Sequence, residues 1–184
     1  AATDVLVRDG RIAAIGASAA GADLTFDAGG RLMIPGLVEA HTHLDKRFWG
    51  MGWHRHTAGP ALIDKIETER RNRREFGIDA DRQSGRLVAQ MVKLGTTHIR
   101  SHVDIDTEHG LRMVEGVLAT RTALRDVVDI ELVAFPQSGL LIRPGTLALM
   151  EQSLSRGFDV VGGLDPAGMD RDPKGHLDAV FALA

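Results

Sequence analysis

The chain has 184 residues, of which 43% are hydrophobic and 26% charged, as is typical of a globular protein about one domain long. Its formal net charge of -3 gives no basic surface for nucleic acid, and no apolar stretch is long enough to span a bilayer. The absence of cysteine excludes disulfides and cysteine-ligated zinc and fits a reducing compartment. We therefore expect a cytoplasmic protein with no nucleic-acid or membrane partner.

Residues 1–34 have the pattern of a small β layer. Four short strands are expected, at residues 4–8, 11–15, 24–27 and 31–34. The first two flank Asp9-Gly10, a dipeptide typical of a two-residue hairpin, and the last two flank a turn at residues 28–30. A layer this small is marginal in water and needs a partner to cover it.

Residues 35–184 alternate between strand and helix patterns. Strands are expected at residues 36–40, 96–103, 127–135 and 158–162, with helices at 61–75 and 79–94, around 111–118 and 147–154, and from 176 onward. Such alternation predicts a parallel sheet, either an open doubly wound sheet or the first four units of a (β/α)₈ barrel. No Gly-x-Gly-x-x-Gly follows the first strand, and a complete barrel needs about 250 residues. We therefore expect half a barrel over residues 35–184.

One predicted helix carries an unusual density of charge. Arginines alternate with glutamates at Arg70, Arg71, Arg73 and Arg74 and at Glu67, Glu69 and Glu75. Mixed charge at this spacing is typical of a helix face in contact with solvent. The sequence therefore predicts an exposed face here rather than an anion-binding patch.

His41 and His43 end the first predicted barrel strand. Side chains of a strand alternate between its faces, so the two imidazoles point the same way. Neutral imidazole is a common ligand of zinc and iron. We therefore predict that His41 and His43 bind a divalent metal ion, although a catalytic site needs about three protein ligands.

Polar residues also end the other predicted strands, where parallel α/β folds place their chemistry. His102 and Asp104 follow the second strand and could contact substrate, order the ligand histidines or satisfy each other. Gln137 follows the third strand, and its amide could read a cyclic –NH–C=O edge or lie in an ordinary turn. Asp165 follows the fourth. These four residues are the predicted substrate-binding set.

The other histidines are less informative. His98 is expected to be a packing residue inside the barrel, because it lies deeper than the strand end. A glycine-rich loop holds His54 and His56 beside Trp49 and Trp53. This loop is consistent with a lid over a pocket and equally with an ordinary surface loop. Nothing in the pattern points to a role for His109 or His176.

The strand-end segments resemble those of a known family. Residues 35–46 resemble the first barrel strand of the amidohydrolase superfamily. Residues 96–106, the Phe-Pro-Gln-Ser-Gly stretch at 135–139 and residues 160–167 resemble the next three strand ends of one branch. That branch contains cytosine deaminase and N-isopropylammelide isopropylaminohydrolase. The resemblance implies a (β/α)₈ barrel, with residues 1–34 forming part of a small β-sandwich.

The resemblance also implies a site. His41 and His43 would bind one Zn²⁺ or Fe²⁺ ion, and Gln137 would hydrogen-bond the ring amide of a small heterocyclic substrate. The remaining metal ligands and the acid–base residues are expected on later strands, beyond Ala184, so the chain alone is not expected to be active. Members of the family often self-associate, which implies a homo-oligomer.

The leading functional hypothesis is hydrolytic deamination of an N-heterocycle, such as a cytosine-like pyrimidine or a triazine, by a metal-activated water. One alternative is hydrolysis of a cyclic amide on the same scaffold. Another is a homologue or fragment that binds a ligand without turnover.

Overall fold

The computed structural model describes every residue except 1–2 and 17–21. The chain divides into two compact units, Ala1–Pro35 and Gly36–Ala184. In the first unit, β1 (Val5–Arg8) pairs antiparallel with β2 (Arg11–Ile15). The predicted hairpin is confirmed, and its turn residues Asp9 and Gly10 both have positive φ angles, of 51° and 71°.

The two further strands predicted in the first unit are absent, so this prediction was wrong. Residues 24–27 and 31–34 have no regular secondary structure and pair with no strand among the described residues. The turn between them does form, because the Arg31 N–H donates to the Ala28 carbonyl at 3.1 Å. A β-strand requires a neighbour for its ladder, and the apolar side chains of Leu24, Phe26 and Leu32 are 86–88% exposed.

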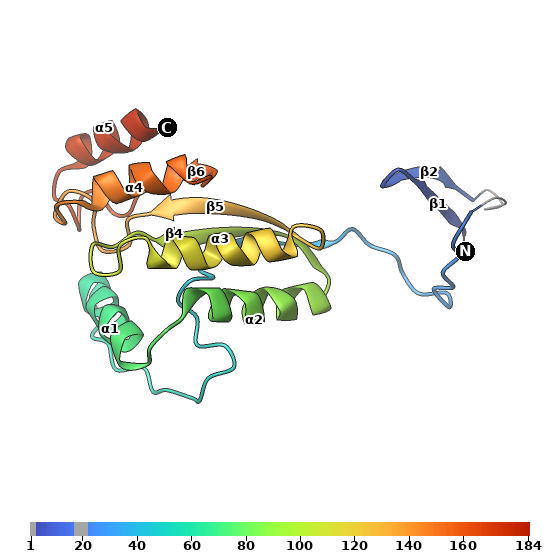
Figure 1. Cartoon of the computed structure of the whole chain (residues 1–184), viewed down its shortest axis with the longest axis horizontal. Helices are drawn as coiled ribbons and strands as arrows, with labels where there is room; N and C mark the ends of the chain where they lie inside the picture. Colours follow the sequence, from blue (N-terminus) through green and yellow to red (C-terminus); the bar gives the residue numbers. More distant parts are fainter. Residues whose placement is uncertain (1–2, 17–21) are drawn as a thin grey trace. The chain divides into compact units, whose positions relative to one another are not determined.

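The second unit alternates strands and helices throughout (Figure 1). Its elements are β3 (Leu37–Thr42), α1 (Leu62–Glu75), α2 (Ala80–Lys93), β4 (Thr96–Asp104), α3 (Arg112–Leu124), β5 (Asp129–Phe135), α4 (Thr146–Ser155), β6 (Val160–Val161) and α5 (Pro173–Leu183). The strands form one parallel sheet in the order β3-β4-β5-β6, which is open in the part of the chain described. The predicted parallel sheet is therefore confirmed, although β6 is shorter than expected and β3 runs on to include His41.

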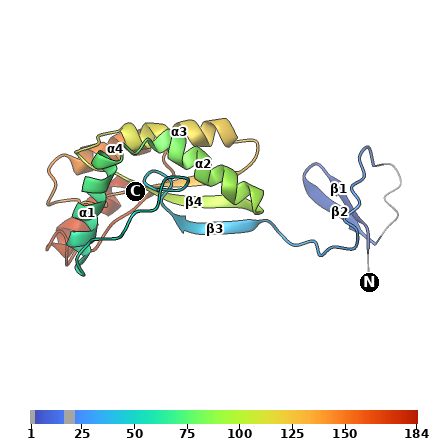
Figure 2. The ribbon, with the colours of Figure 1, turned by 90° about the horizontal axis from the view of Figure 1, so that it is seen from below.

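The helices α2, α3 and α4 cover one face of this sheet (Figure 2). A doubly wound sheet carries helices on both faces, so the arrangement favours the barrel alternative. Alternate side chains of β4 and β5 point into the helical layer, where Ile99, Val103 and Leu132 are buried. They pack in one core with Val114 and Met150.

His98 lies on the opposite face of the sheet. Its side chain is 59% exposed and pairs with Asp129, at 3.2 Å between Nε2 and Oδ2. That His98 packs inside the barrel stays a prediction, because no described residue covers this part of the sheet.

Local signals fix the ends of α2. The Asp79 side chain accepts the Arg82 N–H at 3.0 Å and caps the first turn. Gly95 follows the helix with a φ of 98°, a left-handed conformation that lets the chain turn directly into β4. The predicted helix over residues 79–94 and its glycine stop are thus confirmed. None of the helices within residues 3–16 and 22–184 has both the length and the apolar character needed to cross a membrane.

The contact between α2 and α3 depends on Gly116. A Cβ at this position would lie 2.6 Å from the Asp81 backbone nitrogen and 2.8 Å from the Ala80 Cβ. Substitution Gly116→Ala should therefore lower the free energy of unfolding by about 1–3 kcal/mol, because backbone must move apart. Urea unfolding of the complete polypeptide would measure this loss.

Gly85→Ala is the matched control. Gly85 also lies within a helix, but the nearest atom to its added Cβ is Thr120 Oγ1, at an ordinary 3.7 Å. This variant should be unchanged, or more stable by up to about 1 kcal/mol from helix propensity. Equal losses in the two variants would contradict the close approach of α2 and α3.

Candidate active site

Three imidazoles meet where β3 and β4 end. The ring centroids of His41 and His102 lie 4.3 Å apart, those of His43 and His102 5.6 Å, and those of His41 and His43 5.8 Å. Phe135, at the end of β5, presents its ring edge-on to both His43 and His102. The structure thus brings His102 together with the two predicted metal ligands.

His43 is oriented by Asp104. Its Nδ1 lies 3.1 Å from Asp104 Oδ1, and the carboxylate is fully buried. A carboxylate can only accept a hydrogen bond, so Nδ1 of His43 is the donor, and in the neutral ring the free lone pair lies on Nε2. Metal-binding histidines are commonly held in this way by a carboxylate on the ring nitrogen that does not bind the metal.

The second oxygen of Asp104 is held by two cations. Oδ2 lies 2.8 Å from Arg73 Nη2 and 3.1 Å from Lys46 Nζ, and Lys46 also contacts Glu69 at 2.9 Å. Burial alone would raise the pKa of Asp104, but Lys46, the hydrogen bond with His43 and Arg73 together hold that pKa well below its usual range. Asp104 is therefore a charged group inside the protein.

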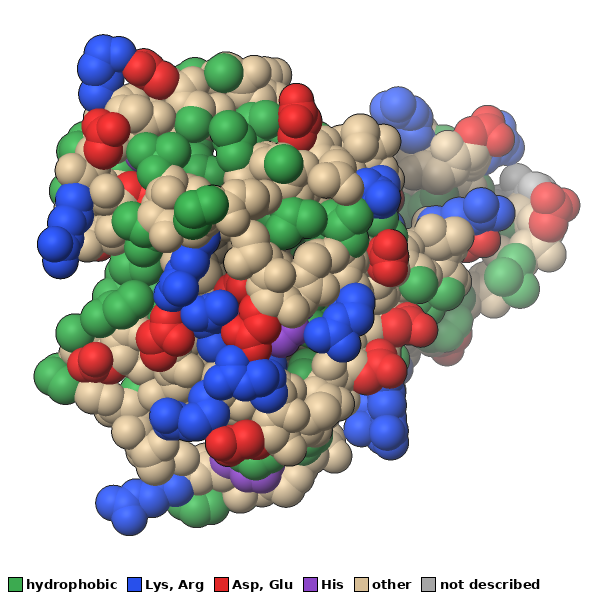
Figure 3. Space-filling view, turned by 60° about the vertical axis from the view of Figure 1, so that its left-hand side comes forward, with side chains coloured by type: hydrophobic (Ala, Val, Ile, Leu, Met, Phe, Trp, Pro, Cys, Tyr) green, Lys and Arg blue, Asp and Glu red, His purple; other side chains and the backbone are tan. Residues whose placement is uncertain are grey.

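The prediction that the arginines of α1 lie on an exposed face is only half correct. Arg71 and Arg74 are exposed as expected, whereas Arg73 is 2% exposed and the Arg70 side chain 12%. Arg70 and Arg73 lie almost one turn apart on the face of α1 that meets the strand ends. The buried carboxylates that they contact, Asp104 of β4 and Asp106 just after it, are far away in sequence, so a local pattern could not identify them. Figure 3, which looks toward this end of the second unit, shows Lys and Arg side chains intermixed with Asp and Glu side chains, with a histidine among them.

Arg70 anchors a second strand-end carboxylate, Asp106. Its Nε lies 3.0 Å from Asp106 Oδ2, which also accepts the Ser138 hydroxyl. Ser138 follows Gln137 in a tight turn, where the Gln137 N–H donates to the Phe135 carbonyl at 2.9 Å. Gln137 is half-buried, in a turn that is fixed on both sides.

Asp45 completes a group of three possible metal ligands with His43 and Asp104, whose ligand atoms lie within 4.8 Å of one another. Asp45 is fully buried, and its Oδ2 accepts the Asp104 N–H at 3.1 Å. Burial and the charge of Asp104 raise the pKa of Asp45. Arg73 and Lys46 already neutralise Asp104, so a metal ion between these carboxylates would face two buried cations. We interpret this group as a charge network behind His43.

The donor set at the imidazole cluster does fit a divalent metal. Burial, and then the neighbouring rings of His41 and His43, lower the pKa of His102 to about 4, so this ring is neutral at neutral pH. The His102 Nδ1 is buried without a hydrogen-bond partner among the described residues. Neutral imidazoles with free nitrogens are what zinc and iron require.

Asp165 lies in the loop after β6. It is exposed, has a φ of 35°, and its Oδ1 accepts the Gly168 N–H at 2.8 Å. The carboxylate thus stabilises its own turn. Two histidines without a sequence signal prove to be buried: His109, and His176, whose Nδ1 lies 2.6 Å from Asp170 Oδ2.

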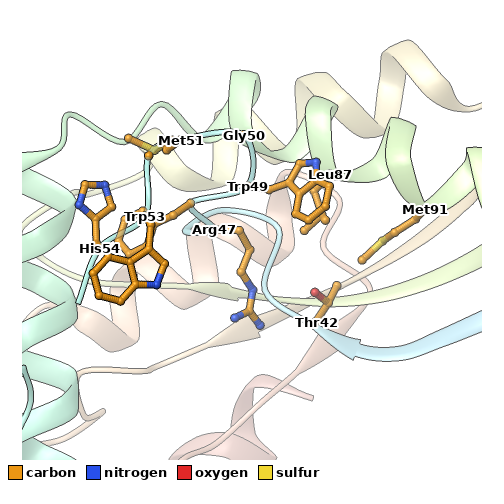
Figure 4. Close-up of a pocket in the computed structure, with 11 residues that line it drawn as sticks. Thr42, Arg47, Trp49, Gly50, Met51, Trp53, His54, Leu87 and Met91 are labelled. Carbon is orange, nitrogen blue, oxygen red and sulfur yellow. The ribbon is translucent and has the colours of Figure 1, made fainter. Parts of the chain in front are cut away.

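The loop between β3 and α1 borders an open pocket of about 660 Å³ (Figure 4). Residues 47–54 line it together with Thr42, Leu87 and Met91. Thr42 points away from the face that carries His41 and His43, so the pocket lies behind β3, on the helix side of the sheet. Gln83 Nε2 donates to the Arg47 carbonyl at 2.7 Å, which ties the loop to α2.

Comparison with known proteins identifies the family. Residues 24–184 match the model named Amidohydrolase family, so the chain belongs to the amidohydrolase family. The chain is 37% identical over 165 residues to "N-isopropylammelide isopropyl amidohydrolase" of Pseudomonas sp. (strain ADP), a match that covers 86% of this chain and 40% of the relative.

Two solved structures are similar to nearly the whole chain. N-isopropylammelide isopropylaminohydrolase from Burkholderia multivorans ATCC 17616 is 45% identical, with a TM-score of 0.85, over 99% of this chain and 46% of that one. 5-Methylcytosine deaminase from Klebsiella pneumoniae is 31% identical, with a TM-score of 0.74, over 99% and 45%. The chain therefore spans less than half the length of these relatives, and the resemblance to their branch is confirmed.

The Asp104 network predicts a large effect on stability. Asp104→Asn keeps the size of the side chain but leaves Arg73 and Lys46 buried opposite a neutral amide. We expect it to lower the free energy of unfolding by roughly 3–5 kcal/mol. The measurement is chemical unfolding with a chelator present, so that loss of metal does not contribute.

Asp129→Asn is the control, because Asp129 pairs with exposed His98 and is itself exposed. Its effect should be about 0–1 kcal/mol. Similar small losses in both variants would contradict the charged state of Asp104.

Proposed function

We propose that the complete protein is a metal-dependent hydrolase that releases ammonia or an amine from an N-heterocycle, a cytosine-like pyrimidine or a triazine. The observation that carries this proposal is the buried Asp104 carboxylate, which fixes the tautomer of His43 beside His41 at the strand ends. Membership of the amidohydrolase family, and the similarity to two structures named for an isopropylaminohydrolase and a deaminase, support the reaction class.

His41 and His43 would hold one Zn²⁺ or Fe²⁺ ion through the nitrogens left free of other contacts. Such an ion supplies a water of lowered pKa, near 7, as the nucleophile. The contribution of this chain is to supply the imidazoles, to orient His43 through Asp104, and to provide an apolar wall at Phe135. The other metal ligands and the acid–base residues would come from later strands.

Gln137 is the residue proposed to recognise the substrate. Its turn is held by Ser138 and Arg143, whose Nε donates to the Ser138 carbonyl at 3.2 Å. An amide in a fixed turn can donate to and accept from a ring –NH–C=O edge at once. His102 would border the same space, whereas Asp104 has both oxygens engaged by protein groups, so we assign it to orientation instead of substrate binding. Asp165 remains a predicted contact from the loop after β6.

Dependence of the reaction on a metal is tested by removing the predicted ligands and the ion. We expect the purified protein to hold a divalent ion, and His41→Ala/His43→Ala to lose both the ion and the release of ammonia or amine from pyrimidines and triazines. Elemental analysis and an ammonia assay measure these. His56→Ala, which changes an exposed histidine outside the imidazole cluster, should retain the ion. Full activity of a metal-free preparation would overturn the proposal.

The substrate role of Gln137 is tested by Gln137→Ala. Losing a hydrogen-bonding partner of the substrate should lower kcat/KM by about 10- to 100-fold, mainly through KM. Gln152→Ala, on the exposed surface of α4, should leave the kinetics unchanged. Identification of the product separates the alternatives: a ring-opened acid without ammonia would favour cyclic-amide hydrolysis, and absence of turnover would favour a binding protein.

A further inference from the structure

We propose that Arg73 of α1 is a positioning residue that holds Asp104, and through it the His43 ring, in the orientation needed to bind metal. The inference rests on the proposed function, because it concerns the same histidine. It extends the site to α1, a helix that contributes none of the three imidazoles.

The contacts form a continuous chain between buried groups. Arg73 Nη2 lies 2.8 Å from Asp104 Oδ2, and Asp104 Oδ1 lies 3.1 Å from His43 Nδ1. The Arg73 side chain is 1% exposed, that of Asp104 0% and that of His43 12%. With a partner on each oxygen, the carboxylate plane of Asp104 is fixed, and so is the direction of the His43 lone pair.

Lys46 cannot replace Arg73 in this role. It lies only three residues after His43 and therefore belongs to the same segment, and its ammonium is shared with Glu69. An ammonium is a point charge on a flexible stem, whereas a guanidinium is a rigid planar fork. Among the described residues, Arg73 makes the direct contact between Asp104 and α1, whereas Lys46 reaches that helix only through Glu69. Arg73 therefore sets the position of the carboxylate relative to α1.

The guanidinium of Arg73 is itself incompletely paired. Its Nε and Nη1 atoms are buried with no hydrogen-bond partner among the described residues. Buried donors without partners are unfavourable, so the side chain is held inside the protein chiefly by its contact with Asp104. A buried guanidinium with two unpaired donors and one contact is better explained by a role in positioning Asp104 than by a contribution to stability.

Arg70 provides the internal comparison. It lies one turn earlier on α1 and its side chain is 12% exposed. Its carboxylate partners are Glu67, Glu108 and Asp106, and Asp106 also accepts a hydrogen bond from Ser138. None of these carboxylates contacts a histidine of the cluster in the structure described. A loss that came only from removing a buried arginine of α1 would therefore appear in both variants.

The test compares Arg73→Met with Arg70→Met in the complete polypeptide. Zn²⁺ affinity of the metal-stripped proteins is measured by competition with a chromogenic chelator, and the visible spectrum of bound Co²⁺ reports ligand geometry. We expect Arg73→Met to bind Zn²⁺ about 10- to 100-fold more weakly and to change the Co²⁺ spectrum. Arg70→Met should match the unmodified protein in both measurements.

If the methionine variant fails to fold, Arg73→Lys takes its place, because lysine keeps the positive charge. Its affinity should still fall, because an ammonium on a flexible stem holds the Asp104 carboxylate less rigidly than a planar guanidinium does. Zn²⁺ affinity unchanged in the folded Arg73 variants, or reduced equally in Arg70→Met, would overturn the inference while leaving the proposed function intact. Absence of Zn²⁺ binding in the unmodified protein would overturn both.

Discussion

The buried carboxylate of Asp104 is the constraint on which the second unit depends. It lies at the end of β4 and contacts His43 after β3 and Arg73 on α1. A buried charge is tolerated only when it is paired and hydrogen-bonded, so these three segments must meet in one arrangement.

The two faces of the sheet carry different kinds of side chain. Toward α2 and α3, alternate residues of β4 are apolar and buried, such as Ile99 and Val103. The other face carries His98, Arg100 and His102, and only the part near the strand ends is enclosed. Imidazoles, a fixed turn at Gln137 and a desolvated anion thus collect at one edge, which is where parallel α/β folds place their chemistry.

How far the sequence could predict this structure depends on how local each signal is. The hairpin at Asp9-Gly10, the ends of α2 and the pairing of His41 with His43 on one face all follow from neighbouring residues. The strands expected at residues 24–27 and 31–34 failed because a strand needs a partner that sequence alone does not supply. Arg73 was missed because 31 residues separate it from Asp104, and its surroundings in sequence look like a solvated helix.

The two buried carboxylates at this edge differ in a way that assigns their roles. Asp104 faces Arg73 and Lys46 directly, and its pKa is lowered, so it remains an anion and can only accept from His43. Asp45 is equally buried, but the charge of Asp104 adds to the cost of burial and raises its pKa. The cations therefore stabilise one negative charge fully and the second only in part. Because Asp104 is the anion, the proton between it and the imidazole stays on His43, and Nε2 of that ring stays available to a metal.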